Sequence, residues 1–126
     1  MIFFSSVVSP SVFASLNSKG SSNFLRTIFP RMFLFGFVIS LIAFILTILS
    51  NDLFNSIVLV IIGLSFLINR NYLTPLINKF RDQELEGDSK AAKNFKIMHL
   101  LSVLLFIINF FLLILVIVLN YINYNL

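Results

Sequence analysis

Few side chains in this sequence could do chemistry, and His99 is the first to consider. It is the single histidine of the chain, close to the start of a long apolar run. An imidazole there could ligate haem iron or relay protons. The alternative is an interfacial histidine that hydrogen-bonds to a neighbouring helix. With no cysteine and one histidine, a thiolate metal site and a multi-histidine site within one chain are both excluded.

Two other polar residues stand beside or inside apolar sequence. Arg70, between Asn69 and Asn71, follows the second apolar run. It could bind an acidic lipid or substrate group, or extend its charged end to the membrane interface. Asn109 lies in the middle of the last apolar run. An unpaired amide is costly in that environment, so we expect Asn109 to face another helix.

Residue sets typical of catalysis are missing from the sequence. The acidic residues lie outside the apolar runs, which leaves no serine–histidine–aspartate set and no pair of carboxylates within the membrane. There is also no glycine-rich phosphate loop. We therefore favour a protein that is not an enzyme, with no confident cofactor and no nucleic-acid partner.

The elements that must position these side chains are long apolar helices. Hydrophobic residues make up 59 % of the 126 residues and charged residues 11 %, against about 25 % charged in soluble domains. Residues 33–49 and 53–68 carry no charge, and residues 97–119 have His99 as their one ionisable side chain. Because about 20 apolar residues span a bilayer, these runs with their flanks predict three transmembrane helices.

We predict an all-α fold: an integral membrane up-down helical bundle with three full transmembrane helices and a truncated N-terminal one. The chain is expected to form one domain over residues 1–126. Its helices should span about residues 2–16, 29–50, 53–86 and 89–120, with Pro30 and Pro75 shaping helix ends and a kink near Pro75. The first segment would be roughly 24 Å long, too short for the membrane core. We interpret it as the second half of a helix, and whether Met1 is the true start stays open.

Small and polar residues form stripes that predict how the helices pack, because close approach of small residues drives helix association in lipid. In the 29–50 segment the stripe is Gly36, Ser40, Ala43, Thr47 and Ser50. In the next segment Ser56 and Gly63 share a face. The last segment has a seam with alternating spacings of three and four, typical of left-handed bundles: His99, Ser102, Phe106, Asn109, Leu113, Val116 and Asn120.

The distribution of basic residues predicts the orientation in the membrane. All nine lie in two segments, residues 19–31 and 70–96. The turn around Asn51 and the end of the chain contain none. Since basic loops stay cytoplasmic, both termini should face outward. We expect the protein in a bacterial inner membrane.

Several short motifs resemble the transmembrane protein 205-like family of small four-helix membrane proteins. The motifs are Phe29-Pro30, Asn69 followed by Pro75, His99 with Ser102 one turn later, and the segment from Phe3 through Pro10. The resemblance implies a four-helix membrane fold whose first helix begins before the position of Met1. It implies no defined activity. A eukaryotic member is associated with platinum-drug resistance, which implies export or trafficking.

Three hypotheses for function follow. The leading one is an uncharacterised, non-enzymatic component of transport or of a membrane complex, with other membrane proteins or a second copy of the chain as partners. The second is a haem-binding redox protein with His99 as an axial ligand. The third is an anionic-lipid-binding protein that uses Arg70, Lys79 and Arg81.

Overall fold

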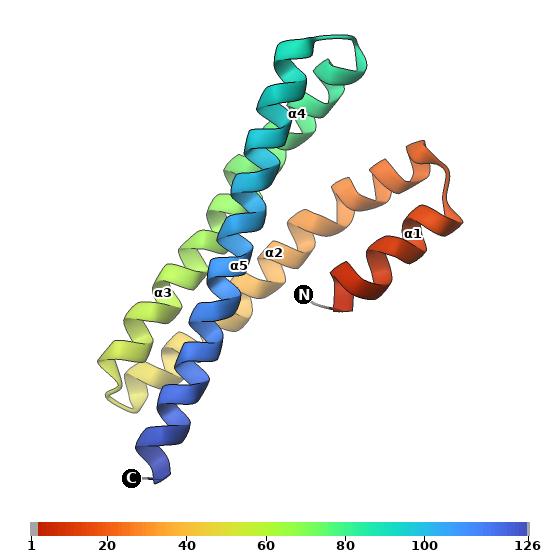
Figure 1. The fold of residues 1–126 in the computed structure, drawn as a ribbon. Helices are drawn as coiled ribbons and strands as arrows, with labels where there is room; N and C mark the ends of the chain where they lie inside the picture. The colour runs from red at the N-terminus through yellow and green to blue at the C-terminus, as the bar shows by residue number, and fades with distance from the viewer. Residues whose placement is uncertain (1–2, 126) are drawn as a thin grey trace.

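The computed structural model describes residues 3–125, without the side chains of Ser5 and of residues 123–125. Figure 1 shows helices and turns in this part of the chain, and no strand occurs there. The elements are the π-helical turns η1 (Phe4–Val8) and η2 (Asn69–Leu73) and five α-helices. These are α1 (Ser9–Ser15), α2 (Ser18–Leu49), α3 (Leu53–Ile68), α4 (Thr74–Leu85) and α5 (Ser89–Asn125).

Three stretches of helix in the described residues are long and apolar enough to cross a membrane. They are α2, the run from α3 to α4 (Leu53–Leu85), and α5 as far as Ile122. The short N-terminal helix precedes them. Together, these helices confirm the predicted all-α membrane fold class. The predicted helix start at Ile2 and the domain ends at Met1 and Leu126 lie outside the described residues.

Helix α3 is the centre of the arrangement. Half of its most apolar stretch is buried, while in the corresponding stretches of α2 and α5 only 11 % and 6 % of the residues are buried. It packs against α2 on one side and α5 on the other, and no Cα of α2 lies within 8 Å of a Cα of α5 in the described part. In Figure 1, α1 stands apart from α4 and α5. The exposed apolar faces of α2 and α5 are suited to contact lipid.

The start of α2 differs from the prediction. The helix begins at Ser18, well before Phe29, because the side chain of Asn17 accepts a hydrogen bond from the Gly20 amide at 2.7 Å and caps it. Pro30 is therefore inside α2 and does not shape its end. Proline has no N–H, so the carbonyl of Arg26 lacks its usual helical donor.

Between α3 and α4 the backbone widens into the π-turn η2, directly before Pro75 at the start of α4. Pro75 offers no N–H and its ring crowds the preceding turn, and both effects favour a wider turn at this point. The Thr74 hydroxyl donates to the Asn69 carbonyl at 2.7 Å, which satisfies a backbone acceptor in the irregular stretch.

Both tight turns between the long helices are built the same way. Asn51 follows α2 with φ of 56° and Gly87 follows α4 with φ of 100°. Each is in the left-handed region that ends a helix with paired backbone bonds. The next residue, Asp52 or Asp88, then caps the following helix by accepting from its first backbone amides.

The contact between α2 and α3 uses the predicted small residues. A Cβ on Gly36 would lie 2.8 Å from the ring of Phe66, and one on Gly63 would lie 3.0 Å from the Ser40 hydroxyl. Further along, Ser56 donates to the Thr47 hydroxyl at 2.9 Å. The two helices therefore approach closely, and the apolar core forms beside them from Phe33, Val58, Ile62 and Phe66.

Candidate functional site

A line of hydrogen bonds joins α3 to α5 and sets the position of the residues predicted for the site. The Ser102 hydroxyl donates to Asn69 Oδ1 at 2.5 Å, and Asn109 Nδ2 donates to Ser65 Oγ at 3.0 Å. Near the other end, Asn55 Nδ2 donates to Asn120 Oδ1 at 3.0 Å. Asn69 and Asn109 are buried, with exposures of 1 % and 3 %. The polar stripes of these two helices thus pair with each other.

The predicted seam of α5 faces inward only in part. Asn109 and Asn120 bond to α3, Ser102 bonds to Asn69 in η2, and Val116 packs against the apolar core. In contrast, His99 and Leu113 are exposed. In the described residues no Cα of α5 lies within 8 Å of a Cα of α2, so this edge of the seam is not packed against α2.

A cleft of about 720 Å³ lies between the N-terminal segment, α2, α4 and α5. Its volume is in the range of about 300–1,000 Å³ typical of small-molecule sites. Aromatic and apolar side chains line much of the wall, among them Phe4, Phe13, Phe29, Met32, Phe33 and Phe106. The polar lining residues include Ser18, Ser22, Arg26, Thr74, Asn78, Arg81, His99 and Ser102. The cleft is therefore amphipathic.

Two arginines from different helices bring positive charge to the cleft. Arg26 of α2 forms a two-point ion pair with Asp82 of α4, with Nη1 of Arg26 3.0 Å from Oδ2 of Asp82. Arg81 pairs with Glu84 at 2.6 Å, and its guanidinium lies 5.4 Å from the ring centroid of Phe95. The Arg26 pair links α2 to α4, and stacking on Phe95 orients Arg81.

His99 lines the same cleft. Its ring is stacked on Phe95, with 5.9 Å between centroids and 14° between planes. Among the described residues, no hydrogen bond holds the imidazole, so the alternative of a histidine bonded to a neighbouring helix is not found. The described residues also contain no group of three or more histidine, cysteine or acidic side chains that could hold a metal ion.

The other candidate residues lie outside the cleft. Arg70 is half-buried in η2, and Pro30 and Pro75 belong to α2 and α4. Asn69 is connected to the cleft indirectly, because its partners Thr74 and Ser102 both line it. No pattern in the sequence indicates that Arg26 and Asn78 belong to the site. The positive charge of Arg26 is evident from the sequence. No local sequence pattern, however, pairs Arg26 with Asp82.

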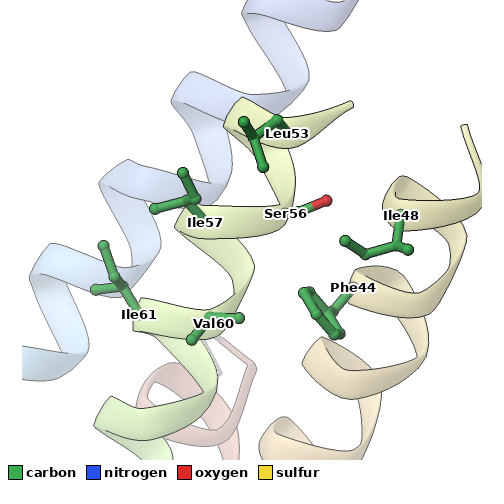
Figure 2. Close-up of a pocket in the computed structure, with 7 residues that line it drawn as sticks. All are labelled: Phe44, Ile48, Leu53, Ser56, Ile57, Val60 and Ile61. Carbon is green, nitrogen blue, oxygen red and sulfur yellow. The ribbon is translucent and has the colours of Figure 1, made fainter. Parts of the chain in front are cut away.

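A second hollow of about 200 Å³ lies between the far ends of α2 and α3. Figure 2 shows Phe44 and Ile48 of α2 pointing toward α3, with the Ser56 hydroxyl directed toward α2. The remaining lining residues are Leu53, Ile57, Val60 and Ile61. The one hydrogen of the Ser56 hydroxyl has two acceptors within reach, the Asp52 carbonyl at 2.7 Å and the Thr47 hydroxyl at 2.9 Å. With no charged group and its one hydroxyl already bonded, this hollow offers only apolar contact.

Comparison with known proteins identifies a family. The family described as "Domain of unknown function (DUF4149)" matches residues 1–86. The chain belongs to this family. The matched residues extend from the N-terminal segment through α4, and include Arg26, Asn78 and Arg81 of the cleft but not α5. No curated protein and no solved structure matches the chain significantly. The family description names no activity and does not support the transmembrane protein 205-like label.

Proposed function

We propose that this chain is a non-enzymatic integral membrane protein that binds an amphiphilic molecule of the bilayer in its cleft, as part of transport or of a membrane complex. The observation that carries the proposal is the cleft itself. Its wall combines phenylalanines with two arginines and several hydroxyl and amide side chains. A ligand with an apolar body and a polar head matches both parts of this lining.

The position of the cleft also supports a ligand from the membrane. It lies between helices that are long and apolar enough to cross a bilayer. On two of its sides are α2 and α5, which have no Cα pair within 8 Å of each other in the described residues. General acid–base chemistry in the cleft would rest on His99, which has no described hydrogen-bond partner to orient it. Binding is thus better supported than catalysis.

The test is photocrosslinking with a phosphatidylcholine that carries a diazirine in one acyl chain, added to the purified full chain in detergent. We expect label on peptides that contain Phe29 and Phe106. Val103→Trp places a large side chain at a cleft-lining position and should reduce this labelling. The matched control is Leu104→Trp, at an exposed neighbouring position that does not line the cleft. Equal labelling of both variants, or label spread evenly over the apolar surface, would refute the proposal.

A second candidate is haem binding. It is favoured by one specific observation: His99 and Met32, which are both haem-ligand types, line the same cleft. Arg81, whose Nη2 is not used in its bond to Glu84, could pair with a haem propionate, whereas Arg26 would first have to leave Asp82. The chain expressed with haem supply and purified in mild detergent should then show a Soret band that His99→Ala abolishes. A colourless, folded protein would exclude this candidate and leave lipid-type ligands.

We also propose a wider kinship, an orientation in the membrane and a class of partner for this chain. The motifs around Phe29-Pro30, Asn69 and His99 support kinship with the transmembrane protein 205-like group. The basic segments support an orientation with α4 and the start of α5 on the cytoplasmic side of a bacterial inner membrane. A second copy of the chain or another membrane protein is the partner expected for the exposed faces of α2 and α5.

A further inference from the structure

The end of the molecule that contains α4 is strongly positive. All nine lysines and arginines lie there, in the first half of α2, in η2 and α4, and in the first turns of α5. Four of the five acidic residues accompany them, and the fifth, Asp52, is in the turn between α2 and α3. This end thus has an excess of five positive charges, which favours anionic lipids at the membrane surface.

Only some of these basic side chains line the cleft. Arg26 and Arg81 line it, whereas Arg70 and Lys79 do not. Arg81 uses Nη1 for its bond to Glu84, and the described structure gives no partner to its other N–H groups. Asn78, one turn earlier on α4, adds an amide to the same wall. A planar guanidinium suits a phosphate because it can donate two parallel hydrogen bonds.

We infer that the occupant of the cleft is an anionic phospholipid whose phosphate is bound by Arg81 and Arg26. This inference rests on the proposed function and adds the class of ligand. The acyl chain lies along the phenylalanine wall, which includes Phe29 and Phe106. The lipid reaches the site from the bilayer around the helices, where it is abundant.

The ion pair across the helices competes with the lipid. The carboxylate of Asp82 occupies both terminal nitrogens of Arg26, and its side chain is 53 % exposed to the surroundings. A phosphate that binds Arg26 must share these donors with Asp82 or displace it. Removal of the Asp82 charge should therefore strengthen lipid binding, which is the opposite of the effect expected at Arg81.

The experiment is native mass spectrometry of the purified full chain, titrated with phosphatidylglycerol and with phosphatidylcholine of the same acyl chains. We expect phosphatidylglycerol to be retained preferentially. Arg81→Gln should weaken its retention about fivefold, the effect of one basic side chain near an anionic lipid, and leave phosphatidylcholine retention unchanged. Asp82→Asn should increase phosphatidylglycerol retention. Lys79→Gln is the matched control, because it removes the same charge from the same helix outside the cleft.

The outcomes separate this inference from the proposed function. If both lipids are retained equally and Val103→Trp reduces both, the cleft binds lipid without selecting the head group, and the inference is wrong while the proposed function holds. If Lys79→Gln weakens retention as much as Arg81→Gln, general surface charge explains the preference and the inference is also wrong. If no cleft variant changes retention of either lipid, the proposed function fails together with it. If Asp82→Asn retains phosphatidylglycerol more weakly than the unchanged chain, Asp82 does not compete with the lipid phosphate for Arg26.

Discussion

Asn109 of α5 donates a hydrogen bond of 3.0 Å from its side-chain amide to the hydroxyl of Ser65 in α3, at a site where both residues are buried. Seven residues earlier in α5, Ser102 makes the equivalent bond to Asn69. Ser102 also lines the cleft. The register that these bonds impose between α3 and α5 therefore determines which side chains of α5 reach the cleft.

Replacing Asn109 by Ala should weaken the contact between α3 and α5. The expected coupling with Ser65→Ala in a double-mutant cycle is about 0.6 kcal/mol, with about 1.7 as an upper bound for such bonds in membrane proteins. The measurement is unfolding in bicelles by titration with a denaturing detergent. The control is Ile108→Ala, at a neighbouring side chain that is 51 % exposed. A coupling of zero would show that the bond between Asn109 and Ser65 does not stabilise the contact between α3 and α5.

A methyl group on Gly36 should disrupt the contact between α2 and α3. The new Cβ would lie 2.8 Å from the Phe66 ring, a distance that forces a shift of one helix or of the ring. Overpacking of this kind costs about 1–3 kcal/mol, measurable by the same unfolding assay.

Two comparisons make the Gly36 prediction specific. Gly63→Ala meets the Ser40 hydroxyl at 3.0 Å, and a single hydroxyl can rotate aside, so its cost should be smaller. Phe66→Leu should recover part of the stability lost in Gly36→Ala, since it removes the ring. If Gly36→Ala is as stable as the unchanged chain, the close approach of α2 and α3 is not as described.

Gly87 ends α4 with φ of 100°, and a Cβ there would meet no atom within 4 Å. The penalty for Gly87→Ala is therefore conformational, on the order of 1–2 kcal/mol for an L-residue in the left-handed region. Gly87→Asn should cost less, because asparagine tolerates that conformation better. Thermal unfolding of the three chains in detergent tests this order, and equal stability of all three would contradict it.

The proposed orientation can be tested directly because the chain contains no cysteine. Ser50→Cys introduces a thiol in the turn between α2 and α3, and Ser89→Cys introduces one at the start of α5. In intact cells, a membrane-impermeant maleimide should label Ser50→Cys and should reach Ser89→Cys only after permeabilisation. The reverse pattern would show that the basic end faces outward, in conflict with the proposed cytoplasmic location.

Much of the fold could be predicted from the sequence because its signals are local. The lengths of the apolar runs indicated three long helices, and the expected boundary between residues 86 and 89 agrees with the end of α4 and the start of α5. The stripe with Gly36 and Ser40 indicated the face that α2 presents to α3. The start of α2 was predicted too late, because the polar residues 18–23 resemble a loop while the capping bond of Asn17 makes them helical.

The sequence by itself determined that this is an all-helical membrane protein with a basic end, since hydropathy and charge are properties of each segment alone. Only the tertiary structure decided where α2, α4 and α5 leave a cleft, and which polar residues line it. Arg26 and Asp82 are 56 residues apart, and no local pattern pairs them. Likewise, His99 and Ser102 are one turn apart on α5, yet the first is exposed in the cleft and the second is bonded to Asn69. Their different environments depend on the way α5 packs against α3, which is a property of the whole bundle.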